Sequence, residues 1–233
     1  MVKNKCFTLT YLIIFCVIQA LLGYFLQGAV GDTYGYITLS IIVLCFITAL
    51  VFFKADFLRF ITLLALFFTV CADFFLCGLI DFENIRTVAM LFFSAVQICY
   101  FLRLYSNQVY TSEKRFHLIL RISLTVIVLI VTLIVLKQSV NALAIVSMFY
   151  YTNLLLNLVY SFIQFKKAPI FALGLLLFVF CDTVLGFSFL PEFLPIKEGS
   201  VIDVINKIDI NLPWMFYTPS QTLIALDIAT KKD

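Results

Sequence analysis

The chain has 233 residues, of which 64% are hydrophobic and 12% are charged. An ordinary soluble domain carries about 25% charged residues, so this composition excludes a water-soluble globular protein. The formal net charge of +3 gives no reason to expect a nucleic-acid partner, because the basic residues follow the boundaries of the apolar segments.

The apolar segments predict eight transmembrane helices. In lipid the backbone must satisfy its own hydrogen bonds, so only helices and closed barrels span the bilayer. The segments are about 18 to 24 residues long and lack the alternation of barrel strands. We therefore expect an all-α polytopic membrane protein, with one transmembrane domain over residues 1–233. The predicted spans are Cys6–Phe25, Tyr36–Phe53, Phe60–Leu79, Arg86–Tyr105, Phe116–Leu136, Ser139–Phe165, Ala168–Leu190 and Ile210–Ala229.

The first of these segments has a second interpretation. A short basic start followed by an apolar run, Cys6–Phe25, also resembles a signal peptide. Seven further spans favour a first transmembrane helix instead.

The basic residues predict the orientation of the helices. Twelve lie at the two termini and at the connections between predicted helices 2 and 3, 4 and 5, and 6 and 7; four lie on the other side. Because positive charge stays in the cytoplasm, both termini are predicted to be cytoplasmic and the membrane to be the cell (plasma) membrane. The twelve are Lys3, Lys5, Lys54, Arg59, Arg103, Lys114, Arg115, Arg121, Lys166, Lys167, Lys231 and Lys232.

The longest connection on the predicted outer side, residues 191–209, contains a helical pattern. Apolar residues recur at helical spacing from Val201 onward, and Ser200 with Asp203 matches an N-cap pair. A short amphipathic helix in the outer interface is therefore expected. It could act as a lid over a site or serve only as a connector.

The sequence contains a short internal repeat. ALFFTVCAD ends at Asp73 and GLLLFVFCD at Asp182; FFSAVQ ends at Gln97 and FYTPSQ at Gln221. Each half thus has a helix with an Asp, then a helix with an aromatic residue four positions before a Gln. This order suggests two four-helix halves related by a parallel internal repeat. The proposed halves are residues 1–105 and 106–233.

Asp73 and Asp182 are the candidate catalytic residues, because each interrupts a long apolar segment. Both lie about 20 Å from the predicted cytoplasmic face, at a depth where an isolated carboxylate is costly. Two carboxyl groups in a low-dielectric pocket are not expected to ionise together, which leaves one acid and one base. Such a pair suits general acid–base hydrolysis; the structural alternative is a polar contact that fixes helix packing. The face predicted to turn inward carries Thr62, Ala65, Thr69, Asp73 and Cys77.

The predicted sixth helix carries a polar stripe that is also expected to face inward, since a lipid-exposed face would not carry two asparagines. Structural hydrogen bonding between helices and substrate binding both remain open for this stripe. Pro213 and Pro219 are expected to kink the last helix and free carbonyl groups beside Gln221. The stripe consists of Ser147, Tyr150, Asn153, Asn157, Tyr160, Ser161 and Gln164.

No metal site or cofactor is predicted. The only histidine, His117, is interpreted as part of a polar loop, and the cysteines show no paired ligand spacing. All seven cysteines lie in apolar segments, so a disulfide framework is not indicated. They are Cys6, Cys16, Cys45, Cys71, Cys77, Cys99 and Cys181.

Four segments resemble the YhhN-like lysoplasmalogenase family of small eight-helix membrane proteins. The likeness covers most of the chain, but it departs from the family pattern at three positions. Ala72 precedes the first Asp where family members have Gly, Cys181 precedes the second where Ser is frequent, and Gln97 stands where a His is common. The matching segments are Phe67–Leu76 (FFTVCADFFL), Gln97–Tyr100 (QICY), Phe178–Leu185 (FVFCDTVL) and Tyr217–Ile224 (YTPSQTLI).

The resemblance implies hydrolysis of the vinyl-ether bond of lysoplasmalogens, a class of lysophospholipid, to a fatty aldehyde and a glycerophospho-headgroup. In that reaction Asp73 and Asp182 would act as acid and base, without an assignment of which is which. The resemblance gives substrate-binding or water-orienting roles to Gln97, Tyr100, Asn153, Asn157, Tyr217 and Gln221.

Two other classes of function fit the same residues. The repeat, the Asp pair and the prolines of the last helix are also compatible with a small-solute or proton-coupled transporter. An assembly protein without catalysis would use the Asp pair only for packing. The sequence does not determine the oligomeric state.

Overall fold

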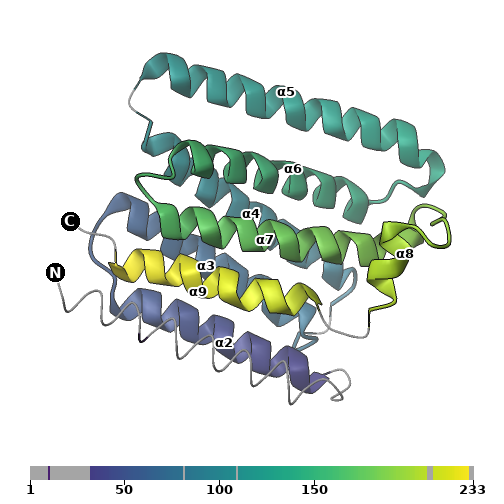
Figure 1. The fold of residues 1–233 in the computed structure, drawn as a ribbon, viewed down its shortest axis with the longest axis horizontal. Coiled ribbons are helices and arrows are strands. Elements are labelled where there is room, and N and C mark those ends of the chain that lie inside the picture. The colour runs from purple at the N-terminus through teal and green to yellow at the C-terminus, as the bar shows by residue number, and fades with distance from the viewer. Residues whose placement is uncertain (1–9, 11–31, 81, 109, 209–211, 231–233) are drawn as a thin grey trace.

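The computed structural model describes residues 10, 32–80, 82–108, 110–208 and 212–230, and these residues form helices without a β-strand (Figure 1). Apart from Thr10, the predicted first span lies outside the described residues. The described elements are α2 (Asp32–Val51), α3 (Phe57–Leu76), α4 (Ile85–Ser106), α5 (Thr111–Leu136), η1 (Lys137–Ser139), α6 (Ala142–Ile163), α7 (Pro169–Phe189), η2 (Leu190–Glu192), α8 (Val201–Asn206) and α9 (Leu212–Thr230).

Five of the described helices, α3 to α7, are long and apolar enough to cross a membrane. Within α2, the segment Gly35–Val51 is also an apolar helix. Helix α9 has 19 residues and buries several polar side chains, among them Gln221 and Asp227. The composition therefore predicted the class of fold correctly: an all-helical protein with several helices suited to a bilayer.

The long helices pack in a series that closes on itself. Each of α2, α3, α4, α6, α7 and α9 contacts the next in this order, and α9 returns to α2. Helix α5 packs on α6 and forms the edge of the bundle opposite α2 (Figure 1). The end where α3, α5 and α7 begin is called the basic end below, because Arg59, Arg103 and Lys167 lie there; the opposite end is called the acidic end.

Local sequence sets several helix starts. Asp56 caps α3 by accepting a hydrogen bond from the backbone N–H of Arg59, and Asn141 caps α6 in the same way from Ala144. Such side-chain caps satisfy amide groups that have no partner within the helix. Pro169 begins α7, where a missing N–H costs nothing.

The predicted amphipathic helix is present as α8, and Ser200 accepts from the N–H of Asp203 as expected. Its two valines are exposed, Val201 by 72% and Val204 by 55%, while Ile202 and Ile205 are partly buried. Exposed apolar side chains suit a helix at a membrane interface. The ammonium group of Lys207, with a backbone N–H, holds the pKa of Asp203 below its usual value. The helix contacts α7; its role as a lid stays a prediction.

Helices α7 and α9 approach each other closely at Gly174. A Cβ atom added to Gly174 on α7 would lie 2.8 Å from Ile224 Cγ1 and 3.2 Å from the backbone oxygen of Ser220, both on α9. The hydroxyl of Ser220 donates to the carbonyl of Gly174 at 2.8 Å. Glycine at this position therefore allows the backbones of α7 and α9 to meet.

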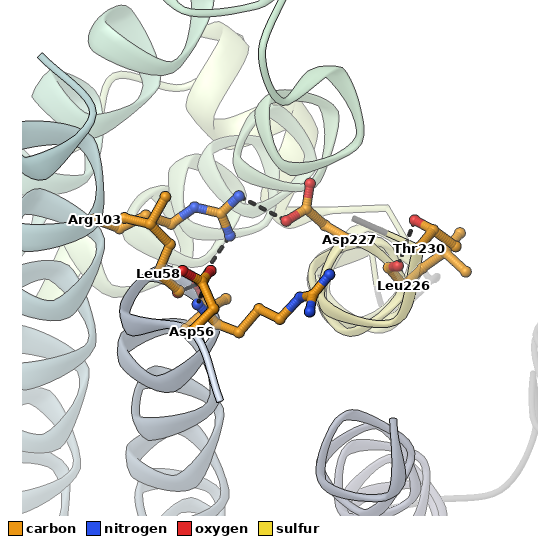
Figure 2. A network of polar contacts seen from close by, with 8 residues as sticks. Asp56, Leu58, Arg103, Leu226, Asp227 and Thr230 are labelled. Atoms are coloured by element: carbon orange, nitrogen blue, oxygen red, sulfur yellow. Dashed lines mark hydrogen bonds and ion pairs between the residues drawn. The ribbon is translucent and has the colours of Figure 1, made fainter. Parts of the chain in front are cut away.

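A buried ion pair joins three helices at the basic end. The guanidinium of Arg103 on α4 donates to Asp227 on α9 at 2.6 Å and to the hydroxyl of Thr62 on α3 at 2.9 Å. Figure 2 shows the Arg103 and Asp227 side chains turned toward each other. The ring of Phe171 lies 3.8 Å from the guanidinium carbon. Because both charged groups are nearly inaccessible to solvent, each stabilises the buried charge of the other.

Candidate functional site

The two candidate acids lie in the same layer of the bundle. Asp73 follows the start of α3 by 16 residues and Asp182 follows the start of α7 by 13, which places them about 24 and 20 Å from the basic end at 1.5 Å per residue. Most of the face of α3 expected to turn inward does so, since Thr62, Ala65, Thr69 and Asp73 are buried. Cys77, the fifth residue of that face, follows the last residue of α3 and is only partly buried.

Each carboxyl group holds a tyrosine hydroxyl from a neighbouring helix. Tyr217 on α9 donates to Asp73 Oδ2 at 2.7 Å, and Tyr150 on α6 donates to Asp182 Oδ2. Asp73 is 1% exposed, while Asp182 is partly buried. Four helices therefore contribute to one site.

Aromatic rings enclose the two tyrosines. Phe93 lies 5.8 Å from Tyr150 and 6.4 Å from Tyr217 between ring centroids. Phe178 lies 5.7 Å from Tyr217 and 6.5 Å from Tyr150. Trp214, the only tryptophan, packs against Tyr217 with 5.5 Å between ring centroids.

The two acids belong to one neighbourhood, because their tyrosine partners contact the same two rings, Phe93 and Phe178. Within the described segments, neither acid forms an ion pair with a basic side chain. Two carboxyl groups of this kind cannot both carry a full charge in a low-dielectric layer without compensation. A pair of this kind favours a state in which one of the two carboxyl groups is protonated.

Several buried polar atoms on α3, α4 and α9 have no hydrogen-bond partner among the described residues. They belong to residues that the sequence predicted to bind a substrate, together with Asp73 itself. Buried polar groups without a protein partner ordinarily bind water or a ligand. The unpartnered atoms are Asp73 Oδ1, Gln97 Nε2, Tyr100 Oη, Gln221 Oε1 and Gln221 Nε2.

The two predicted substrate-binding asparagines of α6 instead bond to neighbouring helices. Asn153 Oδ1 accepts from Arg121 Nη1 on α5 at 2.6 Å, and Asn157 Oδ1 accepts from Arg121 Nη2 at 2.7 Å. Asn157 Nδ2 donates to Gln97 on α4, to its side-chain oxygen at 3.0 Å and its backbone oxygen at 2.9 Å. The polar face of α6 does turn inward, and its asparagines link α4, α5 and α6.

Sequence reasoning missed two features of this region. Tyr150 was placed on the inward stripe but not in the site, although it precedes Asn153 by one helical turn. Placing His117 in a polar loop was wrong: α5 begins at Thr111, and His117 is buried in its second turn, stacked on Tyr160 with 3.3 Å between ring centroids. A helix that begins five residues earlier than predicted carries this histidine into the protein.

The expected kink of the last helix needs one correction. Pro213 lies in the first turn of α9, where proline is tolerated, and only Pro219 lies inside the helix. Pro219 removes one backbone donor within two residues of Gln221.

One open depression of about 330 Å³ lies at the acidic end, between the starts of α4 and α6. It is lined by residues that include Ile85 and Ala142. Each of these precedes Phe93 or Tyr150 by eight residues, or about 12 Å of helix. The depression therefore lies closer to the acidic end than the layer that contains Asp73 and Asp182, and not at the carboxyl groups themselves.

Among the residues that the structure describes, no three His, Cys, Asp or Glu side chains gather in a group that could hold a metal ion. Comparisons with family models, with curated proteins and with solved structures give no match for the chain. The chemistry of the site is therefore inferred from its own residues: one buried and one partly buried carboxyl group, each accepting a tyrosine hydroxyl.

Proposed function

We propose that the protein is a membrane-embedded hydrolase that cleaves the vinyl-ether bond of lysoplasmalogen-type lysophospholipids, with Asp73 and Asp182 as the acid–base pair. The observation that carries the proposal is the carboxyl pair on α3 and α7, in which each member accepts a tyrosine hydroxyl and Asp73 Oδ1 remains free. The family resemblance of the segments around both acids supports the choice of substrate.

The reaction needs one acid and one base. The protonated carboxyl group transfers its proton to the alkene carbon farther from the ether oxygen, which forms an oxocarbenium ion. The carboxylate stabilises this cation and takes a proton from the attacking water. The resulting hemiacetal breaks its carbon–oxygen bond to give a fatty aldehyde and a free glycerol hydroxyl, so that one water is consumed for each bond cleaved.

The remaining predicted residues fit the polar part of this substrate. Gln97, Tyr100 and Gln221 carry buried polar atoms that the described residues do not satisfy, and in the proposal these bind the glycerol unit or the attacking water. Asn153 and Asn157 act in the same region through their contacts with Gln97 and Arg121.

We also propose that the halves of the chain are related by a parallel repeat, with eight spans and both termini cytoplasmic in the cell membrane. Helix α2 contacts α3 and α3 contacts α4, just as α6 contacts α7 and α7 contacts α9; α4 meets α6 and α9 meets α2. In this alignment Phe93 corresponds to Tyr217. Because phenylalanine has no hydroxyl group, Asp182 would receive its donor from Tyr150 instead.

The test is aldehyde release by the purified protein in detergent. The substrate is a 1-alkenyl lysophospholipid, and the control is the same lipid with a saturated ether, which cannot be protonated at carbon. The proposal expects aldehyde only from the vinyl ether and, in D₂O, one deuterium on the carbon next to the aldehyde. Folded protein that releases no aldehyde, but supports pH-dependent solute flux in liposomes, would contradict the proposal and favour a transporter.

A further inference from the structure

Arg121 on α5 is a buried cation whose contacts in the described part of the chain are neutral. The residue is 6% exposed, and its guanidinium donates to the oxygens of Asn153 and Asn157 at 2.6 and 2.7 Å. The ring of Phe101 lies 4.4 Å from its central carbon, and His117 Nε2 lies 3.4 Å from Nη2. Amides, an aromatic ring and an imidazole supply no negative charge.

Two other arginines, unlike Arg121, each contact a carboxylate. Arg103 meets Asp227 at 2.6 Å in the interior, and Arg86 meets Glu192 at 2.9 Å on the surface. No ion pair of Arg121 is found within the described segments. An unpaired charge inside a membrane-spanning helix is strongly unfavourable and marks a functional position.

The contacts described above do not use all the N–H groups of the Arg121 guanidinium. Arginine carries five N–H groups, and Arg121 Nε has no acceptor among the described residues. Gln97 Nε2, held beside the cluster by the contact of Gln97 with Asn157, is a second buried donor without an acceptor. A planar guanidinium presents paired N–H groups that match the oxygens of a phosphate.

We propose that Arg121 binds a phosphate group, with Asn153 and Asn157 holding the guanidinium in place and Gln97 as a further donor. The identification of this phosphate as part of a lysophospholipid rests on the proposed function. The phosphate site itself does not depend on that function. Asn153 follows Tyr150 by one turn of α6, about 4.5 Å along the axis, and Tyr150 binds Asp182. A three-carbon glycerol unit can bridge a separation of this size, with its ether at the acids and its phosphate at Arg121.

Equilibrium binding tests the site without any need for turnover. The ligands are a lysophospholipid with a saturated ether, which is not cleaved, and the matching alkylglycerol without phosphate. The readout is the fluorescence of Trp214, which packs on Tyr217. We expect the phosphate lipid to bind wild type at least tenfold tighter than the alkylglycerol. Arg121→Gln should remove this preference, and Arg115→Gln, an exposed residue on the same helix, should retain it.

A second variant covers the case in which Arg121→Gln does not fold. Asn153→Asp places a carboxylate beside the guanidinium, so the folded variant should bind the phosphate lipid no tighter than the alkylglycerol. If either folded variant keeps the wild-type preference, Arg121 only anchors α5 and the inference is wrong.

Soluble competitors identify the source of the phosphate. Failure of glycerol 3-phosphate and inorganic phosphate to displace the lipid at millimolar concentration would support a lipid headgroup. Displacement by them, absent in Arg121→Gln, would support the phosphate site but assign it to a soluble ester. A phosphate preference without aldehyde release would overturn the proposed reaction and leave this site standing.

Discussion

At the scale of single residues, the decisive contacts are the two tyrosine hydroxyls on the two carboxyl groups. A hydrogen bond to a charged group contributes about 1.5 to 3 kcal/mol, and the donor also fixes which carboxyl oxygen remains free. Asp73 Oδ2 accepts from Tyr217, so Oδ1 is the atom left to hold or receive a proton.

Removing these hydroxyls should slow the proposed reaction without unfolding the protein. We expect Tyr217→Phe and Tyr150→Phe each to lower kcat by about ten- to a hundredfold, because the free energy of one such bond corresponds to that ratio. The control is Tyr151→Phe, which removes a hydroxyl that contacts Thr183 between the same two helices, α6 and α7. Aldehyde release measures all three. Equal effects of Tyr150→Phe and Tyr151→Phe would show that the bond to the acid has no special role.

The sequence predicts the acids but not their partners. An Asp within an apolar segment is visible in one sequence because it is costly in lipid. Tyr150 is not visible in this way, since tyrosine is common in membrane helices and only its direction gives it a role. Arg121 was counted as a boundary charge, and only the packing of α5 against α6 shows that it is buried.

At the scale of helices, the contact of α7 with α9 depends on the absence of a side chain at Gly174. Gly174→Ala should lower the free energy of unfolding by about 1 to 3 kcal/mol, the usual cost of overpacking. Gly186→Ala on the same helix meets nothing within 4 Å, so its higher helix propensity should leave stability unchanged or raise it by up to about 1 kcal/mol. Thermal unfolding in detergent, followed by circular dichroism, compares them. Equal melting temperatures would show that the contact is loose.

The ion pair between α4 and α9 should contribute far more than its surface counterpart. Asp227→Asn leaves Arg103 buried without its carboxylate, which typically costs about 3 to 5 kcal/mol. Glu192→Gln breaks the exposed pair with Arg86 and should cost at most about 1 kcal/mol. The same unfolding measurement checks both. A small loss in Asp227→Asn would mean that water or another group replaces the carboxylate.

Helix positions were predictable because long apolar segments leave few alternatives. The predicted span Arg86–Tyr105 became Ile85–Ser106, a difference of one residue at each end. The start of α5 was missed by five residues, since Thr111–Arg115 is polar and reads as a connection. Polar residues extend a helix beyond the bilayer as readily as they form a loop, and hydropathy does not distinguish the two.

At the scale of the whole molecule, the charge distribution makes a prediction about orientation. In a cysteine-free variant, Lys197→Cys should react with a membrane-impermeant maleimide in intact cells, because its connection is predicted to be outside. Lys166→Cys should react only after permeabilisation. Both lysines are exposed, so neither result depends on burial. The reverse pattern would invert the proposed topology, and the depression between α4 and α6 would then face the cytoplasm.

The central claim is that Asp73 and Asp182 together cleave a vinyl ether, and turnover by Asp-to-Asn variants tests it most directly. Positioned acid–base groups contribute about 10²- to 10⁴-fold, so Asp73→Asn and Asp182→Asn should each lower aldehyde release by at least about a hundredfold. The folded variants should still bind the saturated-ether lipid. Asp203→Asn, in the exposed helix α8, should keep wild-type activity. Undiminished aldehyde release from the Asp73→Asn, Asp182→Asn double variant would contradict the account.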